Sequence, residues 1–272
     1  MFARQNDFNR LAVIVAGLVI AACAPRSAPT SAAAPASAPA GIAPFAPGGT
    51  PTRGGGNPRQ DFDFYLLAMT LAPAFCDDGD NRRKRECQQL DRQAFARTPL
   101  TLHGMWPERL QPQTYPHDCE GPVLSLSRAA RQRMQRLMPG ALEHLDQHEW
   151  RRHGTCALLP PDVYFNDALD LVERANAALG PAIVASAGQR VDGEALRAAA
   201  NAIRPGFGDQ VVFLCHNLRG ADPEKRRRPY LYEVRFCIDN DGPAGRPATP
   251  LACASVNRRD QGCGPGFWID GR

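Results

Sequence analysis

Nine cysteines, an odd number, constrain the fold of this 272-residue chain more than any other feature of its sequence. If Cys23 is set aside, eight remain: Cys76, Cys87, Cys119, Cys156, Cys215, Cys237, Cys253 and Cys263. An even set of this kind can pair completely in an oxidising compartment. The number of cysteines does not give the pairing, since eight of them allow on the order of a hundred arrangements.

Residues 1–22 predict an export signal, which would bring the chain into such a compartment. Arg4 and Arg10 precede an apolar run, LAVIVAGLVIAA, that ends directly before Cys23. The run is shorter than the stretch of about 20 apolar residues that a membrane-spanning helix needs. Its end, IAAC, resembles the cleavage box of bacterial lipoproteins, in which the cysteine carries the lipid. We therefore expect lipidation at Cys23; the alternative is ordinary signal cleavage nearby.

Residues 23–59 predict a flexible tether. The segment is rich in Ala, Pro, Ser and Gly, and has no acidic residue and no apolar periodicity. It cannot bury enough apolar surface to fold. Residues 60–272 are then expected to form one domain.

The net charge of +4 is compatible with an anionic partner such as a nucleic acid, but it is too small to indicate one by itself. They cluster in NRRKR (81–85) and EKRRR (224–228). Such runs are either solvated loops or contacts for a phosphate backbone, and both alternatives stay open. Lys84 and Lys225 are the two lysines of the chain, so an arginine in place of an expected lysine says little.

Apolar periodicity predicts strands and helices in mixed order. Strands are expected over 61–70, 101–107 (closed by Pro107), 210–215 and 230–238. Helices are expected over 126–138, over a segment after Gly140 that includes Trp150, over 162–179 and over 193–203. Because no regular βαβ alternation occurs, we predict the α+β class: a central antiparallel sheet packed with several helices and stabilised by disulfides.

The stretch HEWRRHGTC (148–156) concentrates ionisable side chains. Zinc proteases place two histidines four residues apart on one helical face, whereas His148 and His153 are five apart, about 140° around a helix. The spacing instead pairs Glu149 with His153 and His148 with Arg152 at i,i+4. This pattern suits an anionic substrate better than a metal, so we expect neither a metal nor a cofactor.

Together with TLHGMWP (101–107), this stretch resembles the ribonuclease T2 family of secreted, metal-independent endoribonucleases. The His-Gly-x-Trp-Pro box of that family matches residues 103–107, and its His-Glu-Trp-x-Lys-His-Gly-Thr-Cys box matches 148–156 except for Arg152. The likeness extends from about Asp61 to the C-terminus. It implies an RNA substrate.

The resemblance also implies a role for each ionisable residue of the two boxes. His153 would be the general base, His103 the general acid and His148 a phosphate-binding group. Glu149 and Arg152 would stabilise the transition state and set the charge on the imidazoles. The first product would be a 2′,3′-cyclic phosphate. Histidine suits both proton transfers because its pKa of about 6.5 allows one neutral and one charged ring near neutrality.

Base binding and disulfide pairing are implied in the same way. Trp106 would stack on a base, with Glu108 and Tyr115 as further contacts; the alternative for Trp106 is a place in the core. Trp150 is expected in the core, and His117, His144 and His216 have no matching role. The implied disulfides are Cys76–Cys87, Cys119–Cys156, Cys215–Cys263 and Cys237–Cys253.

Three functions are compatible with these features. The first is an exported ribonuclease of low base specificity, monomeric, and either periplasmic, anchored to the outer membrane by its lipid or secreted. The second is a lipoprotein of the same fold that has lost catalysis and binds RNA or another polyanion, against which the intact His103, His148, Glu149 and His153 argue. The third is a metal-dependent hydrolase that uses the three histidines.

Overall fold

A computed structural model describes residues 62–110, 115–201, 206, 208–220, 222–248, 250–251 and 263–271. The predicted signal, Cys23 and the predicted tether lie outside the described residues. None of the described helices combines the length and the apolar character that crossing a membrane requires.

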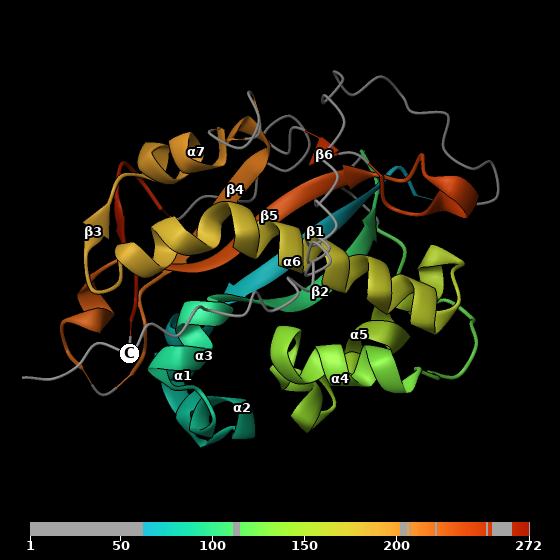
Figure 1. The fold of residues 1–272 in the computed structure, drawn as a ribbon, viewed down its shortest axis with the longest axis horizontal. Coiled ribbons are helices and arrows are strands. Elements are labelled where there is room, and N and C mark those ends of the chain that lie inside the picture. Colours follow the sequence, from blue (N-terminus) through green and yellow to red (C-terminus); the bar gives the residue numbers. More distant parts are fainter. Residues whose placement is uncertain are drawn as a thin grey trace, which may run out of the picture. The chain divides into compact units, whose positions relative to one another are not determined.

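The described strands form one sheet (Figure 1). Strands β1 (Phe64–Leu71), β2 (Leu100–Glu108) and β5 (Tyr230–Asp239) make its centre, where β1 pairs antiparallel with both neighbours. Strands β4 (Val211–His216) and β6 (Pro250–Leu251) also pair antiparallel with β5. Strand β7 (Phe267–Trp268) meets β5 in parallel and pairs antiparallel with β3 (Arg190–Val191). The α+β prediction is confirmed, with one parallel contact that makes the sheet mixed.

The described helices gather around this sheet. They are α1 (Ala72–Asp77), α2 (Arg85–Gln88), α3 (Arg92–Arg97), α4 (Arg128–Leu137), α5 (Leu145–Arg152), α6 (Pro161–Ala185) and α7 (Gly193–Asn201). Figure 1 shows α6 crossing the sheet, with α4 and α5 on the side of β2. A serine caps α4: the Ser127 hydroxyl accepts a hydrogen bond from the Ala130 N–H at 3.1 Å.

Two predicted boundaries were wrong at prolines. Strand β2 continues through Pro107 to Glu108, because β2 is the edge strand of the described sheet and a proline there removes no ladder hydrogen bond. Helix α6 continues through Pro181 to Ala185 instead of ending at Leu179. Ile183, fully buried, extends the apolar face of α6 beyond that proline.

The main core lies on one face of the sheet. Val234, Phe236 and Ile238 enter it from β5, and Trp150, as predicted, packs there against Tyr164 and Phe165. The opposite face carries a smaller apolar cluster of Phe64, Leu66 and Cys237, against which the partly buried Trp106 packs. Trp106 therefore belongs neither to the main core nor to an open surface.

Three disulfides tie the loops to this framework. Cys76–Cys87, Cys119–Cys156 and Cys215–Cys263 are formed, with Cα–Cα distances of 5.3, 5.1 and 4.9 Å. These are three of the pairs that the family resemblance implies. The fourth, Cys237–Cys253, involves a cysteine outside the described residues. The Cys119–Cys156 bridge connects the segment after β2 to the turn Gly154–Ala157 that follows α5.

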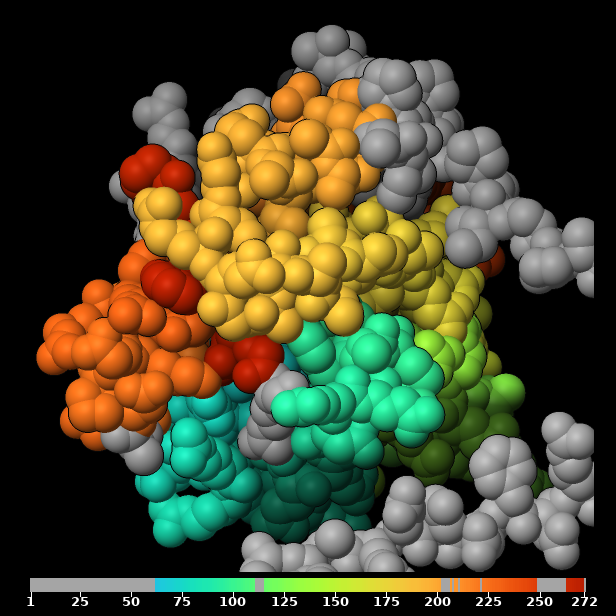
Figure 2. All heavy atoms as spheres, turned by 60° about the vertical axis from the view of Figure 1, so that its left-hand side comes forward, coloured from blue at the N-terminus to red at the C-terminus, as the bar shows by residue number. Residues whose placement is uncertain are grey.

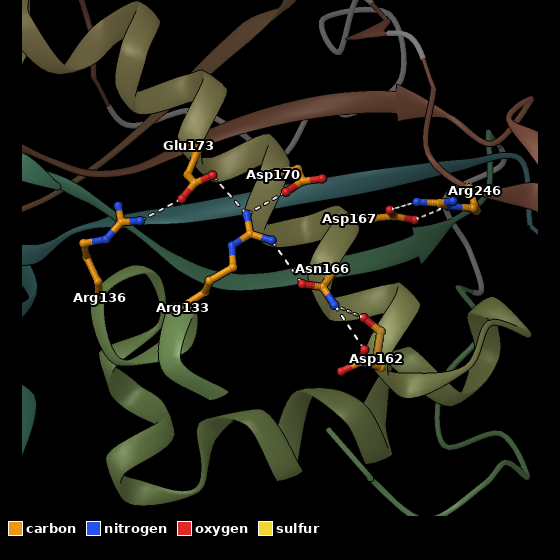
Figure 3. Close-up of polar contacts among 8 residues, drawn as sticks. All are labelled: Arg133, Arg136, Asp162, Asn166, Asp167, Asp170, Glu173 and Arg246. Carbon is orange, nitrogen blue, oxygen red and sulfur yellow. Dashed lines mark hydrogen bonds and ion pairs between the residues drawn. The ribbon is translucent and has the colours of Figure 1, made fainter. Parts of the chain in front are cut away.

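A polar network fastens α4 to α6 (Figure 3). The Arg133 guanidinium reaches Asn166, Asp170 and Glu173 at 3.0, 2.6 and 3.0 Å. Arg136 pairs with the other oxygen of Glu173 at 2.7 Å. These side chains are partly exposed, so each pair contributes little to stability, but together they fix the position of α4 along α6.

Candidate active site

His103 is the extra residue of a β-bulge in β2. On β1, Ala68 faces Gly104 and the next residue, Met69, faces Leu102, so His103 has no partner in the ladder. A bulge bends its strand and redirects a side chain, and bulges are common beside active sites. Here it directs the imidazole toward β5, two strands away, where Nδ1 lies 2.6 Å from Glu233 Oε1.

Glu233 anchors His103 and is a residue that the sequence analysis missed. It is 3% exposed, and its second oxygen accepts a hydrogen bond from Arg235 Nε at 2.8 Å. Burial opposes its ionisation, but the hydrogen bond and charge of His103, together with Arg235, outweigh burial and hold the pKa of Glu233 below its ordinary value. The available signal was an acidic residue two positions before Arg235 in a strand whose other residues are apolar or aromatic, YLYEVRFCI.

The pKa of His103 is raised by the same contact. Burial alone would lower it, but the hydrogen bond and charge of Glu233, with the charge of Glu149, outweigh burial. His103 therefore favours the doubly protonated form, in which Nδ1–H donates to Glu233. The second nitrogen, Nε2, lies 3.9 Å from Glu149 Oε1 and keeps its proton for another acceptor.

Glu149 links the two sequence boxes. This carboxylate is 2% exposed, and Oε2 accepts a hydrogen bond from the Trp106 indole N–H at 2.7 Å. Burial raises the pKa of Glu149, despite the opposing effects of His103 and Trp106. A Cβ atom on Gly104 would lie 2.2 Å from Trp106 Nε1 and 2.3 Å from Glu149 Oε2. The glycine after His103 is thus required by the hydrogen bond that passes over it.

His153 lies at the end of α5, where its backbone N–H donates to the Glu149 carbonyl at 2.9 Å. Burial, then the charges of Arg152, His148 and His103, lower the pKa of His153 to about 4. Its buried Nδ1 has no hydrogen-bond partner in the described part of the chain. The ring is therefore neutral near pH 7 and can accept a proton.

The two imidazoles meet at one indole. Trp106 lies 5.2 Å from His103 and 5.3 Å from His153 between ring centroids. Tyr115 also stacks on His153, with 6.0 Å between the two ring centroids. The fold therefore brings two histidines from separate segments to the same indole, with pKa values shifted in opposite directions.

His148 lies on the exposed side of α5 and lines a cleft of about 350 Å³. The same cleft is lined by His103 from the bulge, by Tyr232 from β5 and by Lys84. The Lys84 ammonium also lies over the Phe75 ring, 5.0 Å from its centroid. His144, Glu86 and Glu143 line it as well, so the cleft combines three imidazoles, one cation and two carboxyl groups around an open space.

Arg152 is held by partners that its motif did not reveal. Its guanidinium forms an ion pair with Asp118 and donates to Tyr115 Oη at 3.2 Å. The Asp118 backbone N–H donates to the Arg152 carbonyl at 2.9 Å, and the Asp118 carboxylate contacts His117 Nδ1 at 2.8 Å. Arg152 thus acts on its surroundings through Asp118, Tyr115 and the neighbouring His153. His117, for which no role was expected, is part of this network.

The remaining candidates are distributed around the site. Glu108 lies partly exposed at the end of β2, while His144 occupies a left-handed position before α5 with φ of 67°. His216 packs edge-on against Tyr232 at 4.5 Å. Within the described ranges, no group of three or more His, Cys, Asp or Glu side chains has an arrangement that could hold a metal ion.

The two basic runs lie against each other, as Figure 2 shows for the orange segment 222–228 beside the blue-green segment near residue 80. Lys225 pairs with Asp77 and Asp270 at 2.5 Å each, and Asp77 also pairs with Arg82. Arg227 and Arg228 share Glu224. Most of these cations therefore pair within the fold, which favours solvated loops over phosphate contacts for both runs. Lys84 differs, because it lines the cleft beside His103.

Comparisons with known proteins agree with the family resemblance that the two sequence boxes indicate. The sequence model described as "Ribonuclease T2 family" matches residues 62–245. Ribonuclease 1 of Arabidopsis thaliana is 26% identical over 196 residues, which are 67% of this chain and 78% of that protein. A ribonuclease of Aeromonas hydrophila is 28% identical over 190 residues, 67% of this chain and 74% of that protein.

Solved structures extend the likeness to the fold. RNase NT in complex with 5′-AMP superposes with a TM-score of 0.55 at 22% identity, covering 78% of this chain and 99% of the other. A single-residue mutant of RNase MC1 in complex with 5′-GMP gives 0.55 at 24% identity, covering 76% and 100%. The matched sequence model and these relatives define the class of this protein as an enzyme. The chain belongs to the ribonuclease T2 family and is a ribonuclease.

Proposed function

We propose that this chain is an exported endoribonuclease that cleaves single-stranded RNA without a metal, through a 2′,3′-cyclic phosphate. One observation supports the proposal most strongly. Two histidines that contact the same indole have pKa values shifted in opposite directions, one toward the charged and one toward the neutral form. Environments that separate the pKa values of two groups assign the acid and the base.

The first step begins at His153. Its neutral ring accepts the proton of the ribose 2′-hydroxyl, and the 2′-oxygen attacks the adjacent phosphorus. The bond from phosphorus to the 5′-oxygen of the next nucleotide then breaks, and His103 donates its Nε2 proton to that oxygen. The products are a 2′,3′-cyclic phosphate and a free 5′-hydroxyl. In the slower second step, water attacks the cyclic phosphate with the two histidines in exchanged roles.

The phosphorane carries extra negative charge that the site must stabilise. His148 faces the cleft and is proposed to contact a non-bridging oxygen. Arg152 is proposed to act through its charge on His153, because Asp118 and Tyr115 hold its guanidinium. Glu149 balances the imidazolium of His103 and orients Trp106 by accepting the indole N–H.

The nucleoside that carries the 2′-hydroxyl is proposed to bind beside Trp106 and Tyr115, with Glu108 as a further contact. The indole N–H is already donated to Glu149, so Trp106 offers its ring to a base and not a hydrogen bond. Another mutant of RNase MC1 was solved with 5′-UMP, which supports a nucleotide-sized site in this fold.

Export completes the proposal. Residues 1–22 would be the signal, Cys23 the lipid-carrying residue, 23–59 the tether and 60–272 the catalytic domain of a monomer. The three described disulfides support an oxidising compartment, either the periplasm, the outer membrane or the medium. Extracellular ribonuclease LE of Solanum lycopersicum, 26% identical over 200 residues, is a relative whose name states such a location.

Purified protein incubated with polyuridylate and excess chelator tests this function. We expect cleavage, with cyclic phosphate ends detected by ³¹P NMR, and loss of cleavage in His103→Ala and His153→Ala. Binding of the polymer without cleavage would instead support the polyanion-binding lipoprotein. Cleavage that chelator abolishes and zinc restores would support the metal-dependent hydrolase.

A further inference from the structure

A second cavity adjoins the cleft beside His103. It has a volume of about 210 Å³ and is bounded by α1, α2 and α3, with Gln135, Arg136 and Pro139 opposite. Phe75, Glu86 and Thr101 line both spaces. We call this cavity, with its lining residues Ala72, Phe75, Cys76, Glu86, Gln89, Leu90, Ala94, Arg97, Thr98, Thr101, Gln135, Arg136 and Pro139, the distal pocket.

One residue that lines the distal pocket has a buried hydrogen-bonding group without a partner in the described part of the chain. Thr98 is 4% exposed, and its buried hydroxyl has no hydrogen-bond partner in the described part of the chain. Buried polar groups are normally paired, so this hydroxyl favours a ligand that offers a donor or an acceptor. Phe75, Leu90 and Ala94 give the walls apolar surface for a flat ring.

The rim of the pocket is polar and cationic. Gln89, Arg97, Gln135 and Arg136 are exposed there. Arg136 is already paired with Glu173, whereas Arg97 has no carboxylate partner among the described residues. A small pocket with apolar walls, a buried hydroxyl and an unpaired guanidinium at its rim fits a base whose phosphate remains outside. The Glu86 carboxyl also lines the pocket, and burial raises its pKa.

The direction of the RNA chain follows from the proposed mechanism. The general acid must face the leaving 5′-oxygen, so the leaving nucleoside lies in the cleft that His103 lines. The strand that continues from this nucleoside toward its 3′ end then passes Phe75 and Glu86, the wall shared by the two spaces. The next base along the strand is the one that reaches the distal pocket.

We infer that the distal pocket binds the base of the second nucleotide beyond the cleaved bond, with Thr98 at its edge and Arg97 at its phosphate. This inference rests on the proposed function. It makes the enzyme prefer substrates that extend at least two nucleotides past the cleavage site. Binding of a base on an aromatic wall typically changes affinity by about tenfold or more, which sets the expected preference.

Substrates with a single ribonucleotide test the inference, because cleavage requires the one 2′-hydroxyl. The mature protein is assayed on rU-dA and on rU-dA-dA. We expect kcat/KM to be about tenfold higher for the longer substrate. Arg97→Ala and Thr98→Val should remove this advantage and leave the rate on rU-dA unchanged. Arg92→Ala, the same change of charge at an exposed position on α3 outside the pocket, should keep it.

The outcomes separate the two proposals. Equal kcat/KM for both substrates, or an equal loss on both in Thr98→Val, would overturn the distal pocket as a nucleotide site while leaving the ribonuclease proposal intact. Failure to cleave either substrate would refute the proposed function. In that case the Kd values of the uncleavable all-deoxy oligonucleotides dU-dA and dU-dA-dA still test the pocket. Tighter binding of dU-dA-dA that is lost in Thr98→Val would support the pocket as a nucleotide site. Equal Kd values would overturn it.

Discussion

Replacing Glu233 with glutamine should separate the anchoring of His103 from the rest of catalysis. The substitution keeps the size and one acceptor oxygen of the side chain, but it removes the negative charge 2.6 Å from Nδ1. A hydrogen bond to a charged group contributes about 1.5–3 kcal/mol, which corresponds to about 10- to 150-fold in rate if it is lost in the transition state. We therefore expect kcat/KM at neutral pH to fall by about 10- to 150-fold.

The pH profile gives the readout that a merely structural role would not change. Because Glu233 raises the pKa of His103, its loss should move the alkaline limb of the kcat/KM profile to lower pH, and activity should recover as the pH is lowered. Glu233→Asp keeps the charge and should keep the limb near its original place. Glu224→Gln, the same chemical change at a half-exposed carboxylate, is the matched control.

The leaving group provides an independent check. Uridine 3′-(4-nitrophenyl phosphate) releases an oxyanion that needs no proton, so the defect of Glu233→Gln should shrink to about threefold or less on this substrate. His153→Ala should remain defective on it, because the 2′-hydroxyl must still lose its proton. A defect of equal size on both substrates, with an unmoved alkaline limb, would refute the view that Glu233 acts through the general acid.

Other perturbations test separate parts of the site. Gly104→Ala would place a methyl group 2.2 Å from Trp106 Nε1 and should lower stability by about 1–3 kcal/mol in urea unfolding, while Gly180→Ala, whose nearest contact would be 3.6 Å, should cost about 1 kcal/mol or less. The contribution of His153 to stability should fall as the pH drops from about 6.5 toward about 4, because the unfolded chain then binds a proton at His153 that the folded chain does not. Thermal unfolding at several pH values should show that His153→Asn loses this dependence. Burial and the neighbouring cations lower the pKa of His153, and the charge of Asp118 partly opposes them. Asp118→Asn should therefore move the acidic limb of the kcat/KM profile to lower pH, and an unmoved limb would contradict this. Arg152→Lys should retain activity within about tenfold in the same assay, since both side chains place a positive charge beside His153.

Short motifs in the sequence were sufficient to select two histidines that the fold brings together. His103 and His153 each belong to a contiguous box, and both rings contact Trp106. Glu233 could not be found in this way, because its contact with His103 depends on a bulge in β2 and on the register of two strand pairs. The pairing of Arg152 with Asp118 likewise depends on how the loop after β2 returns to α5.

The glycines of the two boxes show why motifs of this kind are contiguous. Gly104 leaves space for the hydrogen bond between Trp106 and Glu149, and a Cβ on Gly154 would lie 2.3 Å from the Trp150 ring. Each glycine follows a proposed catalytic histidine because the backbone beside the imidazole must pass close to a large ring. The spacing of residues within each box is therefore set by side-chain packing as well as by the position of the histidine.

Two buried carboxylates flank His103, and their opposite pKa shifts indicate different roles. Glu233 touches Nδ1 at 2.6 Å, and its pKa is lowered, so it carries a full charge that stabilises the imidazolium before the reaction. Glu149 lies 3.9 Å from Nε2, and burial raises its pKa, so its charge is less firmly held. When Nε2 gives its proton to the leaving oxygen, Glu233 still orients the neutral ring through Nδ1–H, while Glu149 loses the cation that favoured its ionised form. In the proposed mechanism, Glu233 therefore fixes the orientation of the acid, and Glu149 responds to the proton transfer. The fixed carboxylate lies on β5 at the centre of the sheet, and the responsive one lies on α5, the helix that ends at the proposed base.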